Sequence, residues 1–303
     1  MTAPSPMDLY ARPGRRVRVA GRRRLNLQVM GEGSPTVILA AGFLGGPLDW
    51  GLVQPYLARS HRTVSFDTAG LGFSDPARGP RTTDAIVDDL HAALGAAGIE
   101  GPYVLAGHSA GGLRLRRFAE RYPAETAGLV LIDSVIDDWE YRLFGGPCPA
   151  IVAERTAFRR MLALARAGRL TPDTVDFKER VGLPREGLSP AVNAMLHAMW
   201  TRPSYLRAAL SESLNLGTAG AAGPPPAPLG DVPLVVLSAG RIAESGFVET
   251  PAQAEAWFAM HDDLTALSTR GSRRTVDCSH NLPVERPRDV GAAIDEVVAM
   301  AGL

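Results

Sequence analysis

The ten residues YVLAGHSAGG, Tyr103–Gly112, join an apolar β-forming run to a glycine-rich turn. Within them, Gly107, Ser109 and Gly111 match the pattern G-x-S-x-G. A helical pattern, GGLRLRRFAERY, follows at once, so the stretch predicts a strand, a tight turn and a helix in that order. A serine on such a turn projects its hydroxyl, and the two glycines leave room for the turn and for helix packing. Ser109 is therefore a candidate nucleophile, with an ordinary glycine-rich turn as the alternative.

A serine hydroxyl is a poor nucleophile unless a base removes its proton. Among the 6 histidines, His280 is the best placed, because it ends the last predicted strand in VDCSHNLPVERP. The others are His61, His91, His108, His197 and His261. We expect surface positions for His61, His91 and His261, and core or surface packing for His197. The side chain of His108 cannot easily reach back to the adjacent serine.

Short β-rich runs alternate with helical patterns along the chain, which is typical of a mostly parallel sheet covered by helices on both faces. We predict eight strands, with the first two as an antiparallel hairpin, at residues 15–20, 24–30, 36–42, 62–70, 103–109, 128–134, 233–240 and 273–280. We predict helices at residues 48–58, 83–97, 110–121, 251–268 and 287–300.

The alternation is interrupted once, between the sixth and seventh strands. Residues 136–230 contain no convincing strand, only helical patterns such as Phe158, Met161, Leu162 and Ala165, followed by the breaker-rich return at 218–231. This segment is longer than a connection between two elements should be. We therefore predict an α/β core formed by residues 1–135 and 231–303, with residues 136–230 inserted as a helical cap, or lid.

The overall charge and composition limit the kinds of partner that we expect. The chain has 303 residues, and 32 Lys and Arg balance 32 Asp and Glu. A net charge of zero gives no electrostatic reason to expect nucleic acid or an anionic membrane surface as a partner. Hydrophobic residues at 46% and charged residues at 21% are typical of globular proteins. We expect a small-molecule substrate, and the sequence predicts no particular oligomeric state.

Targeting and metal signals are also missing from the sequence. The first 25 residues hold no apolar core of signal-peptide length, and polar, arginine-rich sequence follows Arg15 and Arg16, unlike a twin-arginine signal. Cys148 and Cys278 lie far apart and have no CxxC or Cys/His ligand spacing. We therefore expect a cytoplasmic protein without a transmembrane span, a disulfide framework, a metal ion or an organic cofactor.

At this point the sequence resembles the α/β-hydrolase superfamily over nearly its whole length. The resemblance is carried by the G-x-S-x-G turn, by GEGSPTVILAAGFLGGPLDW (residues 31–50), by FDTAGLGFSDP (residues 66–76) and by the terminal SHNLPVERP. It implies a serine-nucleophile, esterase-like member with a cap after the sixth strand. It also implies Ser109 as nucleophile and His280 as general base.

Serine attack on a carbonyl needs donors for the developing oxyanion. One should be the backbone N–H of Ala110, at a helix N-terminus whose dipole favours negative charge. The resemblance to the family's His-Gly-x motif implies Phe43 as the second donor, with Leu44 as the alternative. Ala41 stands where the family usually has histidine.

The acid that orients the histidine has two leading candidates. Many members of the family place it after the seventh strand, where this chain has Ala243, with Glu244 one position later. Asp133 closes the sixth predicted strand, and the superfamily includes members with the acid there. We favour Asp133 over Glu244, and Asp137 or another residue of the cap is a further alternative.

The leading functional hypothesis is hydrolysis of a carboxylic ester or lactone through an acyl-enzyme. The cap is rich in apolar side chains, and Trp139, Met199 and Trp200 are candidates for lining a pocket for a small to medium, fairly apolar substrate. The same residues could also serve carbon–carbon bond hydrolysis or acyl transfer. A further alternative, from another class, is a binding or sensor protein that has the fold but little turnover.

Overall fold

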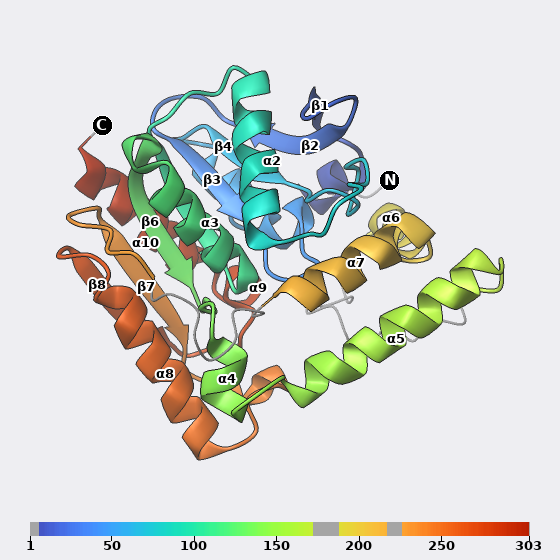
Figure 1. Ribbon diagram of the computed structural model, residues 1–303. Helices are drawn as coiled ribbons and strands as arrows, with labels where there is room; N and C mark the ends of the chain where they lie inside the picture. The colour runs from blue at the N-terminus through green and yellow to red at the C-terminus, as the bar shows by residue number, and fades with distance from the viewer. Residues whose placement is uncertain (1–5, 172–187, 217–225, 303) are drawn as a thin grey trace.

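The computed structural model describes residues 6–171, 188–216 and 226–302. One eight-stranded sheet runs through it, in the order β1-β2-β4-β3-β5-β6-β7-β8 (Figure 1). The strands are β1 (Arg15–Arg18), β2 (Arg24–Met30), β3 (Thr36–Ala40), β4 (Thr63–Phe66), β5 (Tyr103–His108), β6 (Thr126–Ile132), β7 (Leu234–Ala239) and β8 (Gly271–Val276). Strand β2 pairs antiparallel with β1 and β4, and all other neighbours are parallel. The central strands are buried on both faces, as parallel sheets require.

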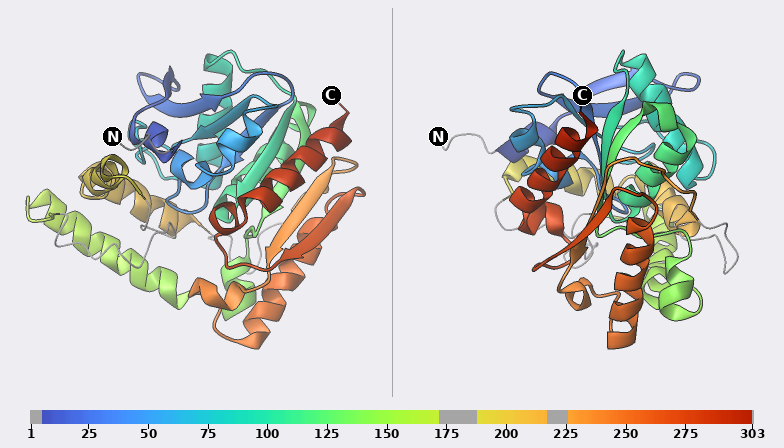
Figure 2. Two further views of the ribbon diagram at one scale, coloured as in Figure 1. Left: turned by 180° about the vertical axis from the view of Figure 1, so that it is seen from behind. Right: turned by 90° about the vertical axis from the view of Figure 1, so that its left-hand side faces the viewer.

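Helices cover both faces of this sheet (Figure 2). On one face lie α2 (Thr83–Ala96), α3 (Ala110–Arg121) and α8 (Pro251–Thr265); on the other lie α1 (Gln54–Leu57) and α10 (Pro287–Ala301). Shorter elements are η1 (Pro6–Ala11), η2 (Pro47–Trp50), η3 (Pro123–Glu125), η5 (Ile242–Ser245) and α9 (Leu282–Glu285). The described segments hold no helix long and apolar enough to cross a membrane.

The predicted α/β architecture is confirmed, with eight strands, an antiparallel first pair and a helical segment after the sixth strand. The predicted helix over residues 48–58 is wrong, because the chain forms η2 and the four-residue α1 instead. Gly51 lowers helix stability between them, and Pro55 has no N–H to donate and fits only the first turn of a helix.

The described residues between β6 and β7 form four helices, and we call this segment the insertion: α4 (Trp139–Phe144), α5 (Pro149–Arg166), α6 (Pro190–Trp200) and α7 (Pro203–Asn215). Figure 1 shows α5, α6 and α7 beyond the carboxyl ends of the central strands. The predicted pattern at Phe158 and Leu162 forms the buried stripe of α5, which packs on α7. The predicted breaker-rich return at 218–231 lies partly outside the described residues.

The turn from β5 to α3 brings backbone into contact with backbone, and this contact requires glycine. A Cβ on Gly107 would lie 2.5 Å from the carbonyl carbon of Gly111. A Cβ on Gly111 would lie 2.1 Å from the carbonyl oxygen of Ala40 on β3, and one on Gly112 would lie 2.2 Å from Ser134 Oγ. The backbone neighbours of Gly107 and Gly111 cannot move aside as a flexible side chain can. The glycines therefore let α3 begin directly above the sheet.

We expect Gly111→Ala to lower the free energy of unfolding by about 3 kcal/mol or more, because the methyl group collides with the backbone of β3. Gly95→Ala is the matched control: Gly95 lies in α2, and a Cβ there meets nothing within 4 Å. The control should be neutral or stabilise the protein by up to about 1 kcal/mol. Urea unfolding of both variants measures this difference, and equal stabilities would contradict the steric explanation.

Candidate active site

Three non-glycine residues in the described chain have positive φ angles: Leu44 (60°), Ser109 (53°) and Asp133 (43°). Such conformations cost on the order of 1–3 kcal/mol each and persist only where the surrounding structure holds them. The three residues follow β3, β5 and β6, which are neighbours in the sheet. Backbone strain is therefore concentrated at the carboxyl edge of the sheet, where ligand sites of α/β folds form.

Ser109 occupies the turn between β5 and α3, with φ 53° and ψ −122°. Its backbone N–H donates to the carbonyl of Ile132 on β6 at 2.9 Å, and its own carbonyl accepts from Ser134 Oγ at 3.2 Å. The backbone is thus held from β6, while the hydroxyl makes no hydrogen bond with any described residue. The side chain is left free toward a cavity that His280 also lines.

His280 and Asp133 are joined by a short hydrogen bond. The distance from His280 Nδ1 to Asp133 Oδ2 is 2.6 Å, and the Asp133 side chain is fully buried. A carboxylate acceptor fixes the proton on Nδ1, which leaves Nε2 as an acceptor. Burial by itself raises the pKa of Asp133, but the hydrogen bond and electrostatic attraction of His280 outweigh it and lower the pKa. Asp133 therefore stays ionised beneath the histidine ring.

The second oxygen of Asp133 is held by two donors that do not come from β6. Asp133 Oδ1 accepts the backbone N–H of Ala239 at 2.9 Å and the indole N–H of Trp257 at 3.0 Å. His261 lies 3.9 Å from the same oxygen and is itself held by Ser238 Oγ at 2.8 Å. Burial lowers the pKa of His261, so it is a neutral neighbour of the carboxylate.

The expectation of a surface position for His261 was wrong, because its side chain is fully buried. Sequence reasoning also gave no role to Trp257. Both belong to a stripe in α8, Trp257, Met260, His261 and Leu264, at the i, i+3, i+4, i+7 spacing of a buried helix face. That spacing is the signal that could have placed His261 in the core. The spacing does not indicate that this helix contacts the carboxylate of Asp133.

The ring of His108 holds the backbone of His280 in place. Its Nε2 donates to the carbonyl oxygen of His280 at 2.7 Å, and the two rings lie 4.7 Å apart. Burial lowers the pKa of His108 to about 3, so the ring is neutral. The ring of Phe247 meets His280 edge-on at 5.2 Å. The loop that carries His280 is therefore held from β5 and packed against an aromatic ring.

The two other predicted acids pair with arginines instead, although Glu244 also lines the cavity that contains Ser109. Glu244 in η5 pairs with Arg241 at 2.9 Å, and its side chain is 54% exposed. Asp137 pairs with the buried Arg116 of α3. The structure therefore brings Asp133, not Glu244 or Asp137, to His280 Nδ1. The catalytic role of Asp133 remains a prediction.

The predicted oxyanion donors lie on two segments that touch. The N–H groups of Phe43, Leu44 and Ala110 donate to no other group in the described residues. A Cβ on Gly42 would lie 3.2 Å from Ser109 Cβ, so the loop after β3 passes directly beside the serine. Ala110 is the first residue of α3. The loop after β3 and the N-terminus of α3 therefore present free N–H donors next to Ser109. Their role in binding an oxyanion remains a prediction.

Comparisons with known proteins show which fold the chain shares with them. Residues 35–147 match the family described as alpha/beta hydrolase fold. Over 95% of this chain, the structure is similar to a thermophilic esterase from Thermogutta terrifontis (TM-score 0.65, 20% identity, 99% of that chain). An enol-lactonase from Burkholderia xenovorans is similar over 94% of this chain and 100% of its own (TM-score 0.67, 22% identity). The structure has the α/β-hydrolase fold.

Curated relatives match the chain to different extents. An uncharacterized protein of Schizosaccharomyces pombe is 38% identical over 82 residues, which is 27% of this chain and 15% of that protein. The uncharacterized protein YqjL of Bacillus subtilis is 24% identical over 268 residues, 88% of this chain and 85% of its own. A 2-hydroxymuconate semialdehyde hydrolase from Pseudomonas sp. is 34% identical over 124 residues, 40% of this chain and 43% of that enzyme.

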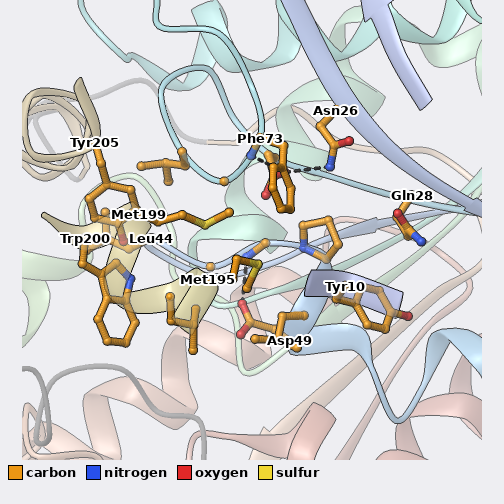
Figure 3. Close-up of a pocket in the computed structure, with 18 of the residues that line it drawn as sticks. Tyr10, Asn26, Gln28, Leu44, Asp49, Phe73, Met195, Met199, Trp200 and Tyr205 are labelled. Carbon is orange, nitrogen blue, oxygen red and sulfur yellow. Dashed lines mark hydrogen bonds between the residues drawn. The ribbon is translucent and has the colours of Figure 1, made fainter. Parts of the chain in front are cut away.

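Two cavities meet at the loop after β3. The first has a volume of about 440 Å³ and is lined by Ser109, His280 and Trp139. The second, drawn in Figure 3, has a volume of about 60 Å³ and is lined by Met199 and Trp200. Of the three predicted substrate-binding residues, only Trp139 therefore lies in the cavity that contains Ser109. The described residues form no cluster of three or more His, Cys, Asp or Glu that could hold a metal ion.

Asp49 lies on the wall that the two cavities share. Its carboxylate accepts the backbone N–H of Gly46 at 2.9 Å, which closes the loop after β3. Burial raises the pKa of Asp49 to about 6, the Gly46 N–H lowers it and the nearby charge of Asp67 raises it. Above pH 6 the loop is therefore closed by a partly buried negative charge.

This charge predicts a pH-dependent effect of Asp49→Asn on stability. The pKa of Asp49 in the folded protein lies above the ordinary carboxyl value near 4, so ionisation costs folding free energy above pH 6 and nothing well below pH 4. The amide oxygen of the variant can still accept the Gly46 N–H. We expect the variant to gain stability relative to wild type as the pH rises from 4 to 8, as measured by urea unfolding.

The control for this experiment is Asp231→Asn, which removes one charge from an exposed site. It should shift stability by the same small amount at both pH values. A difference between Asp49→Asn and wild type that stays constant with pH would contradict a partly buried charge at Asp49.

Proposed function

We propose that the protein is a serine hydrolase that cleaves a carboxylic ester or lactone through an acyl-enzyme. The observation that carries the proposal is the 2.6 Å hydrogen bond between His280 and Asp133 in a cavity that also contains Ser109 on a strained turn. In this arrangement Ser109 is the nucleophile, His280 the general base and Asp133 the acid that holds the ring. The partner is a small-molecule substrate.

The reaction proceeds in two halves. His280 Nε2 takes the hydroxyl proton as Ser109 Oγ attacks the carbonyl carbon, and the carbonyl oxygen becomes an oxyanion held by the N–H groups of Ala110 and Phe43. The ester C–O bond then breaks, and the departing alkoxide takes the proton from His280. Water attacks the acyl-enzyme with His280 as base, the acyl–serine bond breaks, and Ser109 recovers its proton. The net change is ester plus water to acid plus alcohol.

The lining of the first cavity supports a substrate that is not anionic. Its walls include the aromatic rings of Phe43, Trp139 and Phe247, and no Lys or Arg occurs among the described residues that line it. An apolar ester or lactone of small to medium size fits such a lining. We further propose that residues 136–230 act as a cap over this cavity. The likeness to an esterase and to an enol-lactonase agrees with this substrate class.

A second candidate is hydrolysis of a carbon–carbon bond in a diketone-like substrate. It is favoured by the 34% identity over 124 residues to a 2-hydroxymuconate semialdehyde hydrolase. The same three residues would act in that reaction. Acyl transfer uses the same acyl-enzyme with an acceptor other than water, whereas a sensor would bind the substrate without turnover.

A panel of neutral esters, lactones and diketones, assayed with the purified protein, tests the proposal. We expect hydrolysis of esters or lactones, with kcat lowered on the order of 10³-fold or more in Ser109→Ala because no acyl-enzyme forms. Cleavage of diketones alone would favour the second candidate. Binding of a substrate without release of either product would contradict the enzymatic proposal and favour a sensor.

A further inference from the structure

The second cavity lies against the loop that carries the predicted oxyanion donors. Leu44, Gly45 and Asp49 line both cavities, so this part of the loop is a shared wall. One side of the wall faces the cavity of Ser109 and His280, and the other faces a smaller space between β2, the loop after β4 and the insertion. A substrate that extends from Ser109 past Leu44 would reach this space.

The β2 side of the second cavity is polar and incompletely satisfied. Gln28 is only 6% exposed, yet its side-chain amide makes no hydrogen bond with any described residue. Asp67 is 5% exposed; its Oδ2 accepts from Asn26 at 2.8 Å and from the Phe73 N–H at 3.0 Å, while Oδ1 accepts from none of the described groups. These groups are therefore suited to a ligand that supplies the missing hydrogen bonds.

The side formed by the insertion is apolar. Figure 3 shows Met199, Trp200 and Tyr205 together at one end, and Asn26 and Gln28 at the other. Thioether and indole side chains pack against aliphatic or aromatic groups of varied shape. The cavity therefore has an apolar end and a hydrogen-bonding end.

The hydrogen-bonding end favours donors over acceptors. When they are ionised, the carboxylates of Asp49 and Asp67 can accept hydrogen bonds but cannot donate them, and Gln28 adds one more acceptor beside its donors. Arg12 is the single Lys or Arg among the described lining residues, and it is exposed. A substrate chain that ends in a carboxylate would meet two like charges. A chain that ends in a hydroxyl or an ammonium group would find acceptors.

The volume limits the size of the group. A cavity of about 60 Å³ compares with about 10–15 Å³ for a single water molecule. It therefore has room for a tip of about four heavy atoms, and not for a second molecule the size of a whole substrate.

We propose that the second cavity is a specificity subsite for the substrate and that it takes an apolar chain ending in a hydrogen-bond donor, a hydroxyl or an amine. The proposal rests on the proposed ester hydrolysis and adds the chemistry of the distal end of the substrate. Gln28 and the carboxylates of Asp49 and Asp67 bind the donor. Met195, Met199 and Trp200 pack along the chain that leads to it.

Matched p-nitrophenyl esters test this subsite on the acyl side: hexanoate, 6-hydroxyhexanoate, 6-aminohexanoate and the adipate monoester, with acetate as the short reference. A parallel series of acetates with the same four tips on a six-carbon alcohol tests the other side. In one of the two series we expect kcat/KM for a donor-tipped ester to exceed that of the carboxylate-tipped ester at least tenfold. A preference for the amine over the hydroxyl would assign the recognition to the carboxylates, and the reverse would assign it to Gln28.

Two variants locate the preference in the cavity. Gln28→Leu removes the amide with little change in size, and Met195→Trp fills the space; in both variants the tenfold preference should fall to about twofold or less. Tyr141→Trp is the control, because Tyr141 is an exposed side chain of the insertion that lines neither cavity. It should keep the wild-type preference.

The outcomes separate the subsite from the underlying reaction. If wild type hydrolyses acetate but shows no preference for a donor tip in either series, the subsite is overturned while the ester hydrolase stands. A preference that survives in both Gln28→Leu and Met195→Trp also overturns it. If wild type hydrolyses no ester at all, including acetate, the proposed function fails and the subsite fails with it.

Discussion

The buried hydrogen bond from His280 to Asp133 is the interaction on which the rest of the site depends. It joins two strand ends that are 147 residues apart in the chain. An ionised carboxylate without exposure to water is costly unless each oxygen has a partner. Asp133 meets that condition with the imidazole on one oxygen and two N–H donors on the other. The position of this single buried charge therefore depends on how these segments pack together.

Several elements contribute to holding this charge in place. Strand β7 supplies the Ala239 N–H, α8 supplies the Trp257 indole, and β5 supplies His108, which holds the backbone of His280. The positive φ angles of Ser109 and Asp133 place strain on the same edge of the sheet. The tight glycine contacts under α3 hold the serine turn against β3. The rigid core of the fold thus carries the strain that orients the candidate catalytic groups.

The sequence was sufficient to predict the features that depend on local pattern. Alternating apolar runs and helical periodicity gave the sheet, and the strand, turn and helix around Ser109 follow from residues close together in the chain. The choice of acid was different, because Asp133 and Glu244 both follow predicted strands. Only the packing of β6, β7 and the last loop decides which of them meets His280.

Other features depend on contacts between distant segments, and sequence patterns carry no signal for them. Trp257 reaches Asp133 from another layer of the fold. Met199 and Trp200 were predicted in the pocket of Ser109, but the position of α6 beside η1 puts them in the second cavity. That cavity also needs Gln28 of β2 and Asp67 after β4. The sequence does not show that β2 pairs with β4, so the polar end of this cavity could not be predicted from it.

The central claim is that Asp133 holds His280 as the base for Ser109. The most direct test is the rate at which a fluorophosphonate probe labels Ser109 in wild type, Asp133→Asn and Glu244→Gln, with folding of each variant checked by circular dichroism. The side-chain amide in Asp133→Asn would donate to His280 Nδ1 and force the wrong tautomer, so we expect a rate lowered on the order of 10²–10⁴-fold. Glu244→Gln should stay within about twofold of wild type, because Glu244 pairs with Arg241. A large loss in Glu244→Gln with wild-type labelling in Asp133→Asn would contradict the account.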